Sequence, residues 1–71
     1  MTKFQAADTA IAAYDAYVFA SFGRSFDAEK ADTLAAVCVV ECEIAAKDRT
    51  EPASYRKDYA NNAKYFRAIL A

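Results

Sequence analysis

The chain of 71 residues carries ten acidic and nine basic side chains, a net charge of −1, and 56% of its residues are apolar. A chain of this length forms one domain (residues 1–71) and buries only about 60% of the surface that its unfolded form exposes. It has no histidine and a single glycine, which excludes histidine-based catalytic triads and glycine-rich phosphate-binding loops.

The only glycine, Gly23, and the only proline, Pro52, divide the chain into three segments of about twenty residues. Eighteen alanines favour helix throughout. The sequence therefore predicts an all-α, compact three-helix bundle with helices at about 3–22, 27–47 and 52–70. Because large apolar side chains are few, we expect the bundle to be oligomeric.

The first expected helix has two unlike faces. Placing each residue 100° from the last puts the large apolar side chains in one stripe, formed by Phe4, Ala7, Ile11, Tyr14, Val18 and Phe22. The opposite face is flat and carries Ala6, Ala12, Ala13, Ala16 and Ala20. Since alanines let another helix approach closely, we expect Ala13 and Ala16 to contact a partner.

Two carboxylates, Asp8 and Asp15, lie along the edge of the large-residue stripe. Aligned carboxylates can serve a metal or acid–base chemistry, but no third ligand is in view. We interpret this edge as solvated and predict no metal site and no cofactor.

The segment after the first helix reads as a stop followed by a restart. Gly23 supplies the left-handed conformation that ends a helix, and Asp27 or Ser25 can cap the next one. Arg24 lies in this turn, and exposed arginines often anchor protein interfaces. We expect Arg24 to contact a partner.

The second expected helix is the most apolar of the three. Its first face is centred on Leu34, Cys38 and Ala45, with Ala31, Ala35 and Cys42 beside them, and its other side carries Val37, Val40 and Ile44. Such a helix is either central in the fold or shared with a partner.

By helical angle Glu41 falls between Val37 and Leu34/Cys38, on the face of this helix that we assign to the interior. A buried carboxylate is costly unless it is paired. Three readings stay open. Glu41 contacts a tyrosine hydroxyl or an arginine or sits at a wet edge of the bundle, it pairs across a dimer interface, or it serves catalysis as an acid or base. We take Glu41 as an interior or interface carboxylate.

Cys38 and Cys42 share one face at a spacing of four residues. A tetrahedral zinc site needs two more ligands, which only a second copy could supply. The simpler interpretation is a pair of buried, free thiols.

The third expected helix begins near Pro52, with Thr50 or Glu51 as its cap. One stripe is apolar and comprises Tyr55, Tyr59, Asn62, Phe66, Ile69 and Leu70. The far side carries Arg56, Lys57, Lys64 and Arg67, with Tyr65 nearby. Tyr65 and Arg67 fit the profile of interface anchors, whereas the four basic residues could attract a phosphate.

These features favour a non-enzymatic helical module that binds or occludes a partner protein, as an adaptor or a small inhibitor of the kind encoded by phages against host or defence proteins. The alternative is a binder of a phosphorylated ligand, nucleotide or nucleic acid through the basic side of the third helix. A further option is an enzyme whose site forms around Glu41 between copies.

The expected partner is another protein, with self-association to a dimer as one form of it. Residues 1–46 carry a net charge of −4 and residues 47–71 one of +3, which suits contact between copies. No segment has the length and hydropathy of a membrane span or a signal peptide, so we expect a cytoplasmic protein without a membrane partner.

Overall fold

The computed structural model describes residues 2–21 and 26–71, and within them the protein is all-helical, with no β-strand. Helix α1 spans Lys3–Ala20, α2 spans Ala28–Ala46 and α3 spans Ala53–Leu70. These bounds confirm the three predicted helices. The proposed stop at Gly23, the Ser25 cap and the interface residue Arg24 lie outside the described residues.

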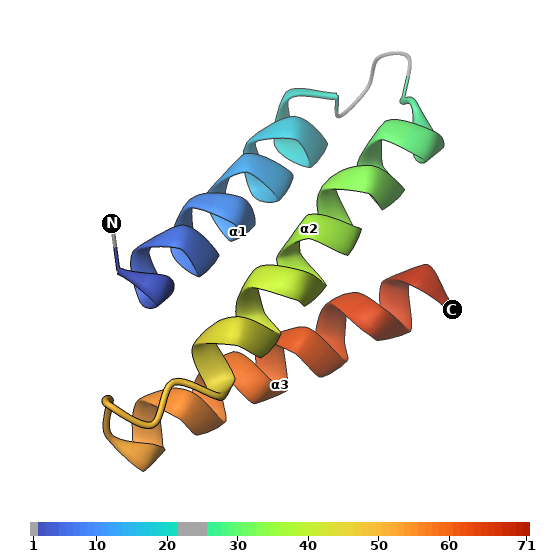
Figure 1. Ribbon diagram of the computed structural model, residues 1–71. Helices are drawn as coiled ribbons and strands as arrows, with labels where there is room; N and C mark the ends of the chain where they lie inside the picture. The colour runs from blue at the N-terminus through green and yellow to red at the C-terminus, as the bar shows by residue number, and fades with distance from the viewer. Residues whose placement is uncertain (1, 22–25) are drawn as a thin grey trace.

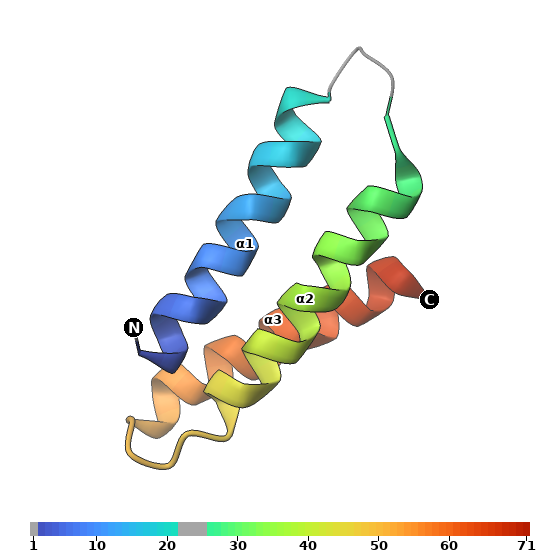
Figure 2. The same cartoon turned by 45° about the horizontal axis from the view of Figure 1, so that its top comes forward.

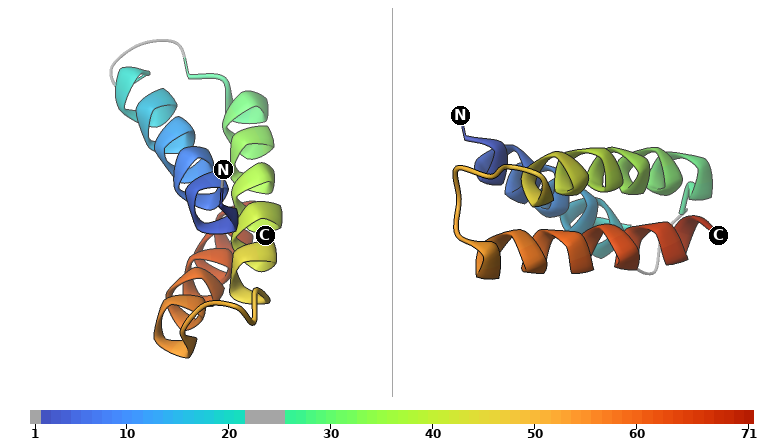
Figure 3. Two further views of the ribbon diagram at one scale, coloured as in Figure 1. Left: turned by 60° about the vertical axis from the view of Figure 1, so that its left-hand side comes forward. Right: turned by 60° about the horizontal axis from the view of Figure 1, so that its bottom comes forward.

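Helices α1 and α2 run antiparallel as a hairpin, and α3 crosses it (Figure 1). Helix α2 is central, because it packs extensively against both other helices. Figure 2 shows that α3 starts near the beginning of α1 and then passes behind α2. The molecule is flattened, with principal extents of 41 × 25 × 15 Å (Figure 3).

Local hydrogen bonds fix where the helices begin. Thr2 and Gln5 form a reciprocal capping box at the start of α1. The side chain of Asp27 accepts a hydrogen bond from the backbone N–H of Lys30 at 3.2 Å, which confirms Asp27 as the cap of α2.

The cap predicted for α3 is wrong. Its N-cap is Pro52, without a side-chain cap bond. Thr50 is used elsewhere, because its hydroxyl donates to Asp48 at 2.6 Å. Neither Thr50 nor Glu51 therefore caps the helix with its side chain.

The core is built almost entirely from small side chains. On α2 the buried residues are Ala31, Ala35, Cys38, Cys42 and Ala45. They meet Ala7 of α1 and Ala63 and Phe66 of α3. Phe66 is the one large side chain that is fully buried among the described residues. The predicted face of α2 is therefore confirmed at its alanines and cysteines, whereas Leu34, at its predicted centre, is half-buried.

The apolar stripe predicted for α3 is right only at its centre. Tyr59 and Asn62 are half-buried and Phe66 is buried, whereas Tyr55, Ile69 and Leu70 are exposed. At the start of the stripe Tyr55 is exposed but keeps an edge contact with Phe4 of α1. At its end Ile69 and Leu70 remain exposed.

We expect Phe66→Ala to lower the free energy of unfolding by about 3–5 kcal/mol, because it opens a cavity in the core. The matched control is its neighbour Tyr65→Ala. That side chain is 62% exposed and touches Phe66 only by an edge contact, so its loss should cost about 1 kcal/mol. Urea unfolding followed by circular dichroism measures both, and equal losses would contradict this view of the core.

Candidate functional site

The alanine face of α1 is solvent-exposed, as a partner-binding surface requires. Ala13 and Ala16 are both exposed. Phe19 lies on the same side, at i+3 from Ala16, and is 85% exposed. That Ala13 and Ala16 contact a partner remains a prediction.

Tyr65 and Arg67 are both exposed, but they do not form one patch. The ring of Tyr65 lies edge-on to Phe66 at 5.1 Å between centroids. The guanidinium of Arg67 pairs with the Glu43 carboxylate of α2 at 2.6 Å. Arg67 thus joins α3 to α2 and is partly neutralised.

The four basic residues of α3 are likewise divided. Lys64 and Arg67, together with Lys47 of α2, line a groove of about 200 Å³ that also contains Glu43. Arg56 instead donates from Nε to the backbone carbonyl of Glu51 at 3.1 Å, and Lys57 does not line that groove. We call the groove lined by Lys47, Lys64 and Arg67 the basic groove.

Glu41 is not an interior residue. It is half-buried, and the described part of the chain buries no polar or charged residue. The interior position is wrong because both packing partners of α2 lie over its small residues, and half-burial fits the reading of a wet edge instead. This packing leaves the side near Val37 and Ile44 open. An interface role for Glu41 remains a prediction.

The side of α2 that points away from α1 and α3 is apolar and uncovered. Val37, Val40 and Ile44 are 47%, 55% and 43% exposed. Their spacing of three and four residues places them in one stripe. We call this stripe the α2 face. The sequence could have indicated it, because α2 is apolar on two sides. Only one of these sides consists of the small residues that allow close packing, so the other is left uncovered.

The two thiols are structural. Cys38 and Cys42 are free and fully buried, and the Sγ of Cys38 donates to the backbone carbonyl of Ala10 at 3.2 Å. Burial raises the pKa of Cys42 to about 11, so the thiol holds its proton at neutral pH. The interpretation as buried free thiols is confirmed.

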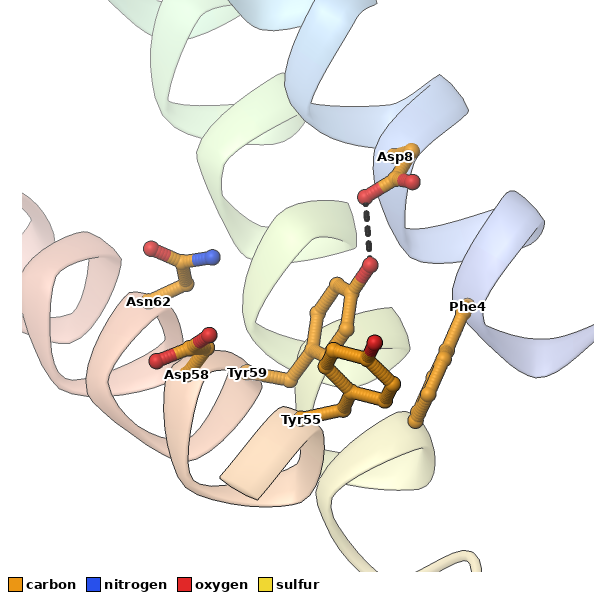
Figure 4. Close-up of a pocket in the computed structure, with 6 residues that line it drawn as sticks. All are labelled: Phe4, Asp8, Tyr55, Asp58, Tyr59 and Asn62. Carbon is orange, nitrogen blue, oxygen red and sulfur yellow. Dashed lines mark hydrogen bonds between the residues drawn. The ribbon is translucent and has the colours of Figure 1, made fainter. Parts of the chain in front are cut away.

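A second hollow lies between α1 and α3. It has a volume of about 350 Å³ and is lined by Phe4, Asp8, Tyr55, Asp58, Tyr59 and Asn62 (Figure 4). We call it the aromatic pocket. Phe4 stacks on Tyr59 at 4.6 Å between ring centroids and meets Tyr55 edge-on at 6.2 Å.

The hydrogen bond between Tyr59 and Asp8 closes one side of this pocket. The Tyr59 hydroxyl donates to Asp8 Oδ1 at 2.7 Å. The sequence interpretation placed Asp8 on a solvated edge and missed this contact. Nothing local indicates it, because the two residues are 51 positions apart.

Comparison of the chain with protein-family models, curated proteins and solved structures found no match. In the described residues, no three side chains of His, Cys, Asp or Glu are grouped to hold a metal ion. Across residues 2–21 and 26–71, none of the helices is sufficiently long and apolar to span a membrane. The function is therefore inferred from the exposed surfaces of the protein.

The Tyr59–Asp8 contact predicts a pH dependence. Burial and the hydrogen bond to Asp8 raise the pKa of Tyr59 to about 12, whereas an unfolded tyrosine titrates near pH 10. Between about pH 10 and 12 the unfolded chain releases a proton that the folded chain keeps. The free energy of unfolding therefore falls as pH rises through this window.

Tyr59→Phe should cost about 1 kcal/mol at neutral pH, through the lost hydrogen bond. It should also flatten the alkaline decline in stability. Urea unfolding at several alkaline pH values measures the slope, with Tyr65→Phe as a control for removal of a phenol. A decline as steep in Tyr59→Phe as in the unsubstituted protein would contradict the assignment.

Proposed function

We propose that the protein is a non-enzymatic helical module that binds a partner protein through the α2 face. The observation that carries the proposal is the exposure of Val37, Val40 and Ile44 along the central helix of the fold. β-Branched side chains gathered in one stripe are characteristic of a helix seam that pairs with another helix. Covering this stripe is how such a module would act as an adaptor or a small inhibitor.

The energetics show how much the α2 face can contribute. Burying a whole Val or Ile side chain stabilises a complex by about 1.5–3 kcal/mol. Since these three are already about half covered, covering the rest contributes about 3 kcal/mol in all. Association costs at least about 4 kcal/mol in lost freedom. Polar contacts at the border of the stripe must therefore add to the binding.

The border residues indicate the partner's chemistry. Glu41 lies beside Val37 and Ile44 on the helix surface, at i+4 and i−3. No described residue forms an ion pair with it, whereas Glu43 on the other border is paired with Arg67. The occupant we propose is an amphipathic helix with an apolar seam and a basic residue placed to meet Glu41. This gives Glu41 the interface role.

The basic groove supports the alternative, a binder of a phosphorylated ligand or nucleic acid, less well. Three cationic side chains line it, but the Glu43 carboxylate lies among them and pairs with Arg67. An incoming phosphate would have to displace that pair. Binding of this kind would weaken steeply with added salt, whereas an apolar seam is much less sensitive to salt.

Replacing Val40 with a photo-crosslinking phenylalanine tests the proposed function in the cell that makes the protein. We expect one discrete adduct with a second protein, because position 40 lies at the centre of the stripe. Adding Glu41→Lys should lower its yield severalfold by repelling the basic residue of the partner. The same crosslinker at the exposed Asn61 is the matched control.

If the adduct contains only a second copy of this chain, the α2 face binds another copy and the proposed foreign partner is wrong. A mass measurement in solution would then show the dimer independently. Equal adducts from positions 40 and 61, or none from either, would contradict the α2 face as a docking surface.

A further inference from the structure

The aromatic pocket combines a defined hollow, which the α2 face lacks, with two negatively charged side chains. Asp8 and Asp58 line it, and no lysine or arginine does. Within the described residues the recorded ion pair joins Arg67 to Glu43, away from this pocket. The pocket therefore carries two carboxylates with no cation of its own.

Its geometry leaves these carboxylates usable. Asp8 accepts the Tyr59 hydroxyl through Oδ1, which fixes its orientation and leaves Oδ2 to accept further bonds. Figure 4 shows Asp58 and Asn62 on successive turns of α3, on the other side of the Tyr59 ring from Phe4. Asp8 thus lies at the hydroxyl end of Tyr59, and Asp58 and Asn62 lie on the side of its ring away from Phe4.

The aromatic rings, like the carboxylates, favour a positively charged ligand. The face of an aromatic ring attracts cations, and Tyr55 is 55% exposed at the pocket rim. A phosphate or carboxylate would be repelled by Asp8 and Asp58. An uncharged apolar group would bury their oxygens without hydrogen bonds, which is costly. A cation is attracted by both the rings and the carboxylates, and an organic one can also cover the ring faces.

We propose that the aromatic pocket binds an arginine side chain of a partner protein, held between the carboxylates of Asp8 and Asp58 and the ring of Tyr55. A guanidinium presents five N–H donors in a plane, so it can bond to several oxygens while it stacks on a ring. A quaternary ammonium has no donors for these acceptors. The site lies on α1 and α3 and is independent of the α2 face, so either can fail alone.

The test titrates the isotope-labelled full chain with N-acetylarginine methylamide at low salt and follows backbone amide shifts by NMR. We expect saturable shifts centred on Asp8, Asp58, Tyr59 and Asn62, with a dissociation constant on the order of 1 mM, typical of a single weakly held group. The uncharged citrulline analogue, which has nearly the same shape, should bind at least about tenfold more weakly.

Substitutions at two pocket positions, Asp58 and Tyr55, locate the binding. Asp58→Asn should weaken it about fivefold or more by removing one charge. Tyr55→Ala should weaken it severalfold, whereas Tyr55→Phe should retain it because the ring remains. Asp32→Asn, an exposed carboxylate on α2, is the matched control and should leave the affinity unchanged. Circular dichroism checks that each variant keeps its helices.

Equal binding of the arginine and citrulline probes would overturn the proposal. Shifts that never saturate, or that Asp32→Asn reduces as much as Asp58→Asn does, would reduce it to general attraction between an acidic surface and a cation. Tighter binding of tetramethylammonium than of the arginine probe would overturn the role of the N–H donors.

Discussion

The close approach that small side chains allow on α2 is the constraint on which the rest of the structure depends. Its buried face consists of alanines and cysteines alone. Helices meeting through such residues can lie close together and cover each other's backbone. The same face serves both neighbours: Cys42 and Ala45 form a cluster with Ala7 of α1 and Ala63 of α3. One small-residue stripe thus holds the molecule together.

The small size of the core residues has a consequence for the surface. Small residues bury little area, so Phe66 is the one large side chain that the described core encloses, and a flattened molecule results. The larger residues of α2 remain outside, as the α2 face. In a protein of ordinary composition they would form the core. Here they remain available to a partner, which is the physical basis of the proposed function.

The crossing of α3 creates the second surface. Because α3 begins beside the start of α1 and then diverges, its first turns bring tyrosines against Phe4. The hydrogen bond from Tyr59 to Asp8 ties α1 to α3 directly. The pocket that forms there is acidic, although the last third of the chain is basic. The sign of the local charge is therefore set by which residues meet, and the net charge of a segment does not predict it.

The sequence by itself determined what depends on neighbours along the chain: three helices, the Asp27 cap and the small-residue face of α2. Helical periodicity and capping are local, so residues within one or two turns settle them. Only the tertiary structure decided the angle at which α3 crosses the hairpin. With that crossing, Tyr55 is exposed and Asp8 meets Tyr59 across 51 positions. Packing between helices sets it, and no periodicity within a single helix records which turns another helix will cover.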